Sequence, residues 1–280
     1  MLFGALWQHD AMDPHSEDVL SRGAPPPDDR RPYAAEPAQV YDVRFPSSRP
    51  PAPDSSGPGV HRGTVLVVHG GFWRAAYDRA HAAAQAAALA EAGWHVAVGE
   101  YRRAGMPGGG WPGTFDDIAA LVATVSDDPD LPGPLVLMGH SAGGHLVAWA
   151  ANQPWADHLA GVVVLGGCVD LGATDEMHLG RDAARDLLGT PESAPEGWRA
   201  ADPMTALPPR VPVRLVHGEL DREVPLAVTD AYLRRARAAG GDVTLDVVAD
   251  AGHYSLIDPL SHAWPHVLGA LSTVASPGLR

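Results

Sequence analysis

One short motif places a serine where its hydroxyl could act as a nucleophile. The motif GHSAG spans residues 139–143, directly after the apolar run Pro134–Met138 and before the helical pattern of Gly143–Ala151. A G-x-S-x-G motif between a strand and a helix forces a sharp turn that holds the serine at a strained backbone position above the sheet. The pattern therefore predicts that Ser141 is the nucleophile of an acyl-transfer reaction.

A serine hydroxyl is a weak nucleophile at neutral pH, so it needs a general base, and the base needs an orienting carboxylate. Asp221 and His253 each follow an apolar run, Val211–Val216 and Val243–Val248 respectively. Each therefore lies on a loop just beyond a strand end, and serine, acid, histidine is an established chain order for such triads. We expect Ser141, Asp221 and His253 to form a catalytic triad.

Other side chains compete for these roles. Four further carboxylates lie near the same strand ends and are alternatives for the acid: Asp170, Glu219, Glu223 and Asp250. His217 could compete with His253 as the base, but it directly ends a strand, and we expect it to fill a structural place.

A second glycine motif could supply hydrogen bonds to a developing negative charge. The sequence HGGFW occupies residues 69–73 and follows the apolar run Thr64–Val68. Glycines let the backbone approach an oxyanion without a Cβ in the way. We expect an oxyanion hole built from the amide of Ala142 and that of Gly70 or Gly71. Phe72 and Trp73 lie beside this hole and are the candidate substrate-binding residues by position, although aromatic residues usually fill cores.

Further pocket candidates follow from position alone, and each is expected to be a core residue before it is a ligand contact. They are Tyr101, Cys168, Val169, Trp198 and Met204. No dedicated base is evident for Cys168, and buried cysteines are usually inert. No H-E-x-x-H or similar spacing occurs, so we expect no metal site and no cofactor.

The elements that must position these residues alternate along the chain. Short runs rich in Val and Leu predict buried strands at Thr64–Val68, His95–Val98, Pro134–Met138, Gly161–Leu165, Val211–Val216 and Val243–Val248. Ala- and Leu-rich segments between them predict helices at Ala75–Ala92, Phe115–Val125, Gly143–Ala151 and Leu226–Ala239. This alternation predicts an α/β fold with a mostly parallel sheet and helices on both faces.

The remaining segments suggest one domain with additions. Residues 1–37 are polar and rich in Pro and Asp, which predicts an N-terminal arm or loosely packed segment. Residues 38–280 form the domain: 39–45 alternate like a half-exposed strand, 46–60 are rich in Pro, Ser and Gly, and 170–205 read as a small cap insertion.

Composition excludes several classes of protein. The 280 residues carry a net charge of −14, which disfavours nucleic acid as a partner. All basic residues are Arg, so Schiff-base chemistry on a Lys and a P-loop are excluded. A single Cys excludes an intramolecular disulfide. No apolar stretch reaches ~18 residues and the N-terminus is a poor secretory signal, so we expect no membrane association and a cytoplasmic location.

Together the motifs HGGFW, GHSAGGH, GELDREVP and AGHY resemble the α/β-hydrolase superfamily, from about residue 39 to the C-terminus. The HGG motif resembles hormone-sensitive-lipase-like esterases, and HGG followed by Trp73 resembles arylformamidases (kynurenine formamidases). The resemblance implies that Ser141 is the nucleophile, Asp221 the acid and His253 the base, with Gly70 and Gly71 in the oxyanion hole. It also implies hydrolysis of small carboxylic esters or, for arylformamidases, of N-formylkynurenine.

We therefore expect a cofactor-free serine hydrolase that cleaves small carboxylic esters or aryl formamides through an acyl-enzyme. One alternative is an aminopeptidase-like peptidase of the prolyl oligopeptidase type, although a chain of this length has no room for the propeller that such peptidases usually carry. Another is a non-catalytic ligand-binding protein on a hydrolase scaffold. The sequence does not specify the substrate. It does not specify the oligomeric state either, and a homodimer is one of the open alternatives.

Overall fold

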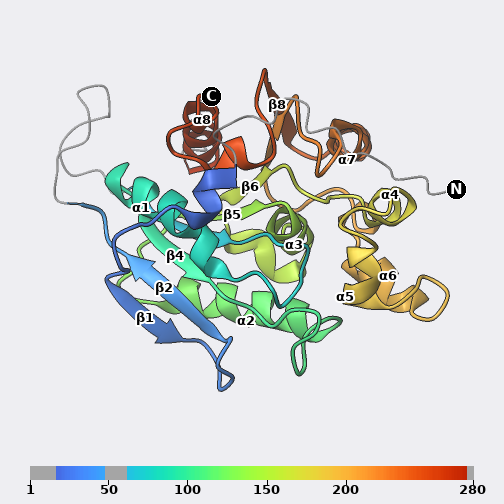
Figure 1. Ribbon diagram of the computed structural model, residues 1–280, viewed down its shortest axis with the longest axis horizontal. Helices are drawn as coiled ribbons and strands as arrows, with labels where there is room; N and C mark the ends of the chain where they lie inside the picture. The colour runs from blue at the N-terminus through green and yellow to red at the C-terminus, as the bar shows by residue number, and fades with distance from the viewer. Residues whose placement is uncertain (1–16, 48–61, 276–280) are drawn as a thin grey trace, which may run out of the picture.

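The computed structural model describes residues 17–47 and 62–275, and its centre is an eight-stranded sheet (Figure 1). The strand order is β1-β2-β4-β3-β5-β6-β7-β8. Strands β3 to β8 are parallel, whereas β1 and β2 run antiparallel at one edge. The strands are β1 Asp29–Pro32, β2 Val40–Arg44, β3 Thr64–Val68, β4 His95–Gly99, β5 Leu135–His140, β6 Gly161–Leu165, β7 Val213–Gly218 and β8 Val243–Val248. The mostly parallel sheet predicted from the alternation is confirmed.

Successive side chains of the central strands enter two different cores, because neighbouring residues of a strand point to opposite faces. Leu66 and Leu137 pack with the helices of one face, α2 (Gly113–Asp127), α3 (Ala142–Ala150) and α7 (Leu226–Ala238). Val65 and Val136 pack with α1 (Ala83–Glu91) and α8 (Trp264–Ala275) on the other face. Both faces are thus covered, which explains why the strands are apolar throughout.

The connections bring the two glycine motifs together. Strand β3 lies between β4 and β5, so the chain leaves β3 toward one side of the sheet and returns to β5 on the other. The carboxyl ends of parallel strands at such a reversal leave a crevice where ligands bind. Residues 69–73 follow β3 and residues 139–143 end β5, so both motifs lie at this crevice.

The N-terminal segment differs from the expectation of a loosely packed arm. Residues 1–16 lie outside the described part of the chain, but η1 (Glu17–Ser21) and β1 pack onto the domain. Val19 is buried, and Arg22 forms an ion pair with the buried carboxylate of Asp258. The polar, Pro-rich composition gives little signal for this packing, because an ion pair and the pairing of β1 with β2 hold the segment in place.

Residues 170–205 form a group of short elements at the right of Figure 1, between β6 and β7. They are α4 Leu171–Glu176, α5 Ala183–Leu188, α6 Pro195–Ala201 and η4 Pro203–Thr205. Asp186 pairs with Arg74 of the loop after β3 at 2.6 Å. Gly180 lies so close to Phe72 that an added Cβ would collide with the ring. This insertion therefore lies against the loop that carries the first glycine motif.

The remaining 3-10 helices are η2 Arg79–Ala82, η3 Pro154–His158 and η5 Tyr254–Ile257. The C-terminal helix α8 is not among the helices predicted above, and most of the stretch 46–60 lies outside the described residues.

No helix in the described ranges is long and apolar enough to cross a membrane. Over the same ranges, no three His, Cys, Asp or Glu side chains are grouped so that they could hold a metal ion.

A buried ionic cluster fixes the loop that follows β3. Glu100, 4% exposed, lies at the end of β4 and accepts hydrogen bonds from His69 at 2.9 Å and from Arg103. The other ring nitrogen of His69 lies 2.8 Å from the carbonyl of Gly70. Burial raises the pKa of Glu100, but the hydrogen bond with His69 and the charge of Arg103 outweigh it and lower that pKa to about 2. The first glycine motif is thus anchored through a carboxylate that must be ionised.

Glu100→Gln tests this anchor through its pH dependence. Because the pKa of Glu100 lies near 2 in the folded state and near 4.5 otherwise, its stabilisation is present above pH 4.5 and is lost as the pH falls toward 2. Urea unfolding should show the variant destabilised by up to about 3 kcal/mol at pH 7, with the difference shrinking below pH 4.5. Glu91→Gln, on the exposed end of α1, is the control. A difference that stayed constant down to pH 3 would contradict the assignment.

Leu137→Ala tests the core beneath the crevice. Leu137 is 0% exposed in the central strand β5, so truncation leaves a cavity and should cost about 2–5 kcal/mol in the free energy of unfolding. Leu260→Ala removes the same atoms from a side chain that is 80% exposed and should change stability by less than about 0.5 kcal/mol. Equal effects would mean that β5 does not lie in the core.

Candidate active site

The turn between β5 and α3 holds Ser141 in a strained conformation. Its φ is 56° and its ψ is −120°, a region that residues with a side chain rarely occupy. The Ser141 amide donates to the carbonyl of Leu165 on β6 at 2.9 Å. An added Cβ at Gly139 would collide with the carbonyl of Gly143, and one at Gly143 would collide with that of Val68. The two glycines of the motif therefore permit backbone contacts that no other residue would allow.

Asp221 and His253 form a buried hydrogen-bonded pair. The Nδ1 atom of His253 donates to Oδ2 of Asp221 at 2.7 Å. The other carboxylate oxygen accepts the amides of Glu223 and Val224, each at 2.9 Å. The Asp221 side chain is fully buried and that of His253 is 4% exposed. This arrangement fixes the tautomer with the proton on Nδ1 and leaves Nε2 of His253 as the basic atom.

Gly166, just after β6, is a residue that the sequence reasoning missed. Its φ is +51°, and an added Cβ would stand 2.9 Å from Oδ2 of Asp221 and 3.2 Å from Nδ1 of His253. Only a glycine leaves room for the acid–base pair. The signal was present in the sequence, because a pair of glycines directly follows the apolar run Gly161–Leu165.

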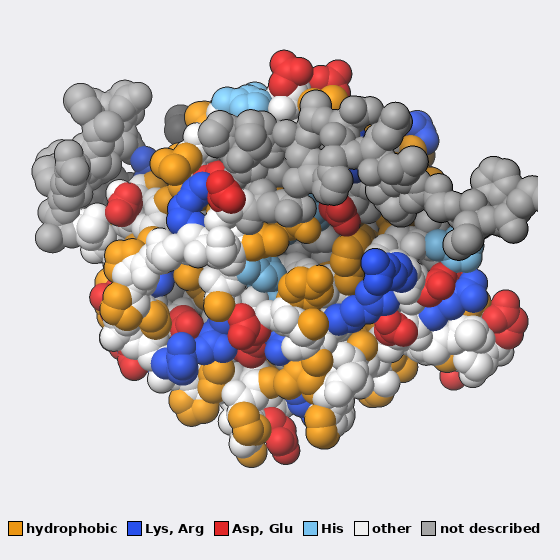
Figure 2. Space-filling model, viewed as in Figure 1, with side chains coloured by type: hydrophobic (Ala, Val, Ile, Leu, Met, Phe, Trp, Pro, Cys, Tyr) orange, Lys and Arg blue, Asp and Glu red, His pale blue; other side chains and the backbone are white. Residues whose placement is uncertain are grey.

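Ser141 and His253 border the same cavity, which has a volume of about 110 Å³. Its lining comes from η1 and from the loops after β3, β5, β7 and β8. The residues are Leu20, Gly71, Phe72, Tyr77, His81, His140, Ser141, Glu223, His253 and Tyr254. Figure 2 shows His side chains at the centre of this view of the molecule, between hydrophobic ones. Leu20 is a contribution from the N-terminal segment that the sequence did not predict.

The amides expected to form the oxyanion hole lie next to Ser141. An added Cβ at Gly70 would stand 3.1 Å from the Cβ of Ser141, so the two backbones are in close contact. Gly71 has a φ of +105° and lines the cavity. Ala142 is the first residue of α3, and the N–H groups of a first helical turn have no acceptor within the helix. The structure thus brings together the three predicted amide positions.

Trp73 corrects one expectation. The sequence places Phe72 and Trp73 together beside the substrate, but only Phe72 lines the cavity. Trp73 is 0% exposed, and its indole N–H donates to the carbonyl of Ala142 at 3.1 Å. Both residues have a positive φ, 50° and 56°, so the chain reverses between them and the second side chain enters the core. Trp73 holds the nucleophile turn in place and does not touch the cavity.

Two of the competing acids, Asp170 and Glu219, and the competing base have other partners. Asp170 caps α4 by accepting the amide of Ala173 at 2.9 Å, and Glu219 accepts that of Asp250 at 3.4 Å. His217 is 0% exposed; it donates from Nε2 to the carbonyl of Val224 at 3.0 Å and accepts from Thr229 at 2.9 Å. His217 therefore supports the loop that carries Asp221.

The further pocket candidates are buried and lie outside the cavity lining. Tyr101 stacks on His69 with ring centroids 4.5 Å apart and donates to the His69 carbonyl at 2.8 Å. The Trp198 indole donates to the carbonyl of Gly189 at 3.0 Å. Burial, together with the charges of Asp221 and Glu223, raises the pKa of Cys168 to about 12. This residue is therefore a neutral thiol near Ser141, and its position gives it no nucleophilic character.

His140 is a second residue near the site whose role the sequence did not indicate. It is buried, its ring lies 4.4 Å from that of His253, and its Nε2 donates to the His253 carbonyl at 3.1 Å. Burial and the nearby His253 hold the pKa of His140 well below its usual value. Burial likewise lowers the pKa of His81 to about 4. Both rings are neutral at pH 7.

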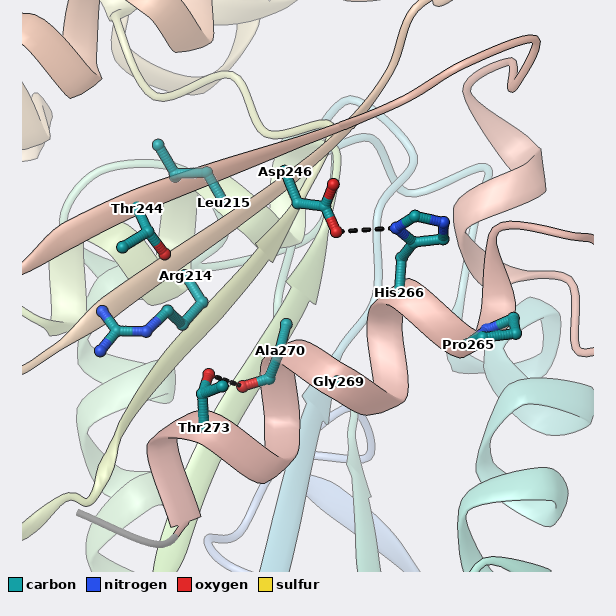
Figure 3. A pocket seen from close by; sticks show the side chains of 9 residues that line it. All are labelled: Arg214, Leu215, Thr244, Asp246, Pro265, His266, Gly269, Ala270 and Thr273. Carbon is teal, nitrogen blue, oxygen red and sulfur yellow. Dashed lines mark hydrogen bonds and ion pairs between the residues drawn. The ribbon is translucent and has the colours of Figure 1, made fainter. Parts of the chain in front are cut away.

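A larger hollow of about 420 Å³ lies away from Ser141, between strands β7 and β8 and helix α8 (Figure 3). Its charged side chains are already paired. His266 bonds to Asp246 at 2.7 Å, and Arg214 bonds to Asp242 at 3.0 Å. It contains no nucleophile next to a base, so the chemistry belongs to the smaller cavity.

Solved structures with a similar fold include several esterases. Esterase B from Lactobacillus rhamnosis has a TM-score of 0.73 at 18% identity, covering 93% of this chain and 90% of that one. A truncated carbohydrate esterase from gut microbiota has a TM-score of 0.70 at 19% identity, covering 88% and 95%. An esterase of the planctomycete Thermogutta terrifontis has a TM-score of 0.65 at 18% identity, covering 92% and 96%. At these identities, the likeness establishes the fold.

The family follows from the sequence itself. The profile of the prolyl oligopeptidase family matches residues 85–262, which include the turn at Ser141, Asp221 and His253. The match extends over more than half of the chain. The protein therefore belongs to the prolyl oligopeptidase family, within the α/β-hydrolases.

Proposed function

We propose that this protein is a serine hydrolase that cleaves small carboxylic esters through an acyl-enzyme, without a cofactor. The observation that carries the proposal is the strained turn at Ser141, which borders the same cavity as the ring of His253. That ring is oriented by Asp221, whose Oδ2 lies 2.7 Å from Nδ1 of His253. A serine in this turn, beside an oriented imidazole, is the arrangement that activates a hydroxyl.

The reaction follows from the positions of these groups. The hydroxyl of Ser141 adds to the substrate carbonyl while Nε2 of His253 takes its proton. When the carbonyl re-forms, the bond to the leaving alkoxide breaks, and His253 returns the proton to it. A water molecule then attacks the acyl-enzyme with His253 again as base, which releases the acid and restores Ser141. Asp221 stabilises the imidazolium that forms in each half-reaction.

The amides of Ala142 and of Gly70 or Gly71 are the proposed donors to the tetrahedral oxyanion. Removing one such donor typically costs ~3 kcal/mol of transition-state stabilisation. The ionic cluster of Glu100, His69 and Arg103 lies directly behind this loop. The loop is therefore fixed before substrate arrives, which is what makes such donors effective.

Cavity size favours short acyl groups. At about 110 Å³, the space beside Ser141 is of the size that an acetyl or propionyl group fills. Aryl formamides carry an even smaller acyl group and are the alternative substrates. Trp73, the residue behind the arylformamidase resemblance, lies in the core, so nothing in the cavity favours formamides over esters.

A peptidase is the second candidate, because the matching family is that of prolyl oligopeptidase. The same serine, base and oxyanion donors cleave amides, so turnover of aminoacyl anilides relative to p-nitrophenyl esters distinguishes the two.

For location, we propose the cytoplasm, since the single Cys is buried and unpaired.

Ser141→Ala should remove the nucleophile and lower kcat on p-nitrophenyl acetate by about 10⁶-fold. Intact mass after incubation with a fluorophosphonate should show one adduct on the wild type and none on the variant. Circular dichroism serves as the control for folding. An adduct that persists in the variant would show that another residue is the nucleophile.

Asp221→Asn should lower kcat by about 10³–10⁴-fold, because the amide no longer favours the proton on Nδ1 of His253. Asp250→Asn is the matched control, since Asp250 lies three residues before His253 and its φ of 56° suits Asn equally well. The control should keep nearly full activity. Equal losses in the two variants would argue against Asp221 as the acid.

A further inference from the structure

Among the residues that the structure describes, the lining of the cavity beside Ser141 holds one carboxylate and no guanidinium. Ten residues of the described ranges line it; Glu223 is the carboxylate, and none of the ten is Arg or Lys. The His81 and His140 rings are neutral, because burial lowers their pKa values. Asp221 does not line the cavity and is paired with His253. The formal negative charge among the described lining residues therefore lies at Glu223.

Glu223 is held close to the reacting groups by its own backbone. Its amide donates to Oδ1 of Asp221 at 2.9 Å, so the residue belongs to the loop that fixes the acid. Its side chain is exposed at the rim of the cavity. Within residues 17–47 and 62–275, no ion pair involves this carboxylate, unlike Asp221 beside it. The charge of Glu223 also acts on the buried Cys168 and contributes to the raised pKa of that thiol.

Aromatic rings border the same space. Phe72, Tyr77 and Tyr254 line the cavity together with Glu223. The faces of such rings attract ammonium groups, and a nearby carboxylate adds to the attraction. The net charge of −14 would further favour the approach of a cation over that of an anion.

We infer that Glu223 makes this site selective for esters that carry a positive charge, such as a quaternary or primary ammonium group, close to the scissile bond. The inference rests on the proposed esterase function and specifies its substrate class. The acyl group occupies the cavity beside Ser141, and the cationic part of the leaving group lies at the rim between Glu223 and the aromatic rings.

A pair of esters with the same shape tests charge alone. Acetylcholine and 3,3-dimethylbutyl acetate differ only in a quaternary nitrogen in place of a carbon. For the wild type, we expect kcat/KM to favour the cationic ester by about three- to tenfold at low ionic strength, the range of an exposed charge pair combined with ring contacts. The preference should fall in 0.5 M NaCl, because salt screens exposed charges.

Glu223→Gln keeps the shape of the side chain and removes its charge. The ratio of the two kcat/KM values should fall toward one in this variant. Glu219→Gln removes a charge from the same loop outside the cavity and should leave the ratio as in the wild type. A wild-type ratio at or below one, or a ratio that Glu223→Gln leaves unchanged, would overturn the inference. If Glu223→Gln does not fold, Glu223→Ala removes the same charge and should likewise bring the ratio toward one.

The same comparison can be made without turnover. Two phosphonates with choline and 3,3-dimethylbutanol as leaving groups label an activated serine at measurable rates. Faster labelling by the cationic reagent supports the charge selectivity of the site. If neither acetate is cleaved, that result counts against the proposed ester substrate and not against the charge selectivity. Equal labelling rates overturn the charge selectivity and leave the serine hydrolase in place. No labelling of Ser141 by either reagent overturns both.

Discussion

Close contact between backbones at the turn of Ser141 is the constraint on which the site depends. A strand must end, reverse direction and begin a helix within one residue, and that residue has a φ of 56°. The turn fits because Gly139 and Gly143 have no side chains to collide with neighbouring carbonyls. The same contacts bring the loop after β3 against the helix start, so the serine, the amides around it and the cavity share one rigid frame. Trp73 adds a further contact to this turn, because its indole N–H donates to the carbonyl of Ala142.

Around this frame, ionised side chains are held by main-chain groups and by one another. Asp221 receives two amides and one imidazole, and Glu100 receives an imidazole and a guanidinium. Buried charges are costly unless they are paired and hydrogen-bonded in this way. The two carboxylates therefore act at different places: one orients the base, and the other fixes the loop across the cavity from it. Glu223, at the rim, is the carboxylate left to face a ligand.

The sheet and the triad positions could be predicted because each strand is apolar on both faces and each motif directly follows one. Other elements gave a weaker or misleading signal. Strand β1 has the sequence DRRP and lies at the sheet edge, where Arg31 pairs with Asp128 at 2.7 Å, so no apolar alternation marks it. Helix α8 does carry an apolar stripe, at Val267, Leu271 and Val274, so its sequence contains the signal of an amphipathic helix. Trp73 could not be placed because its direction depends on two successive residues of positive φ, which spacing does not reveal.

The insertion between β6 and β7 contributes none of the residues that line the cavity, yet Gly180 packs directly against Phe72, which does. A shift of the insertion would therefore reach the pocket through the Phe72 ring and through Arg74, which pairs with Asp186. A substitution that moved Gly180 would leave the hydrogen bonds of the triad in place and would displace the Phe72 ring that a substrate contacts. Such an arrangement lets the insertion alter the fit of a substrate without contacting the groups that carry out the reaction.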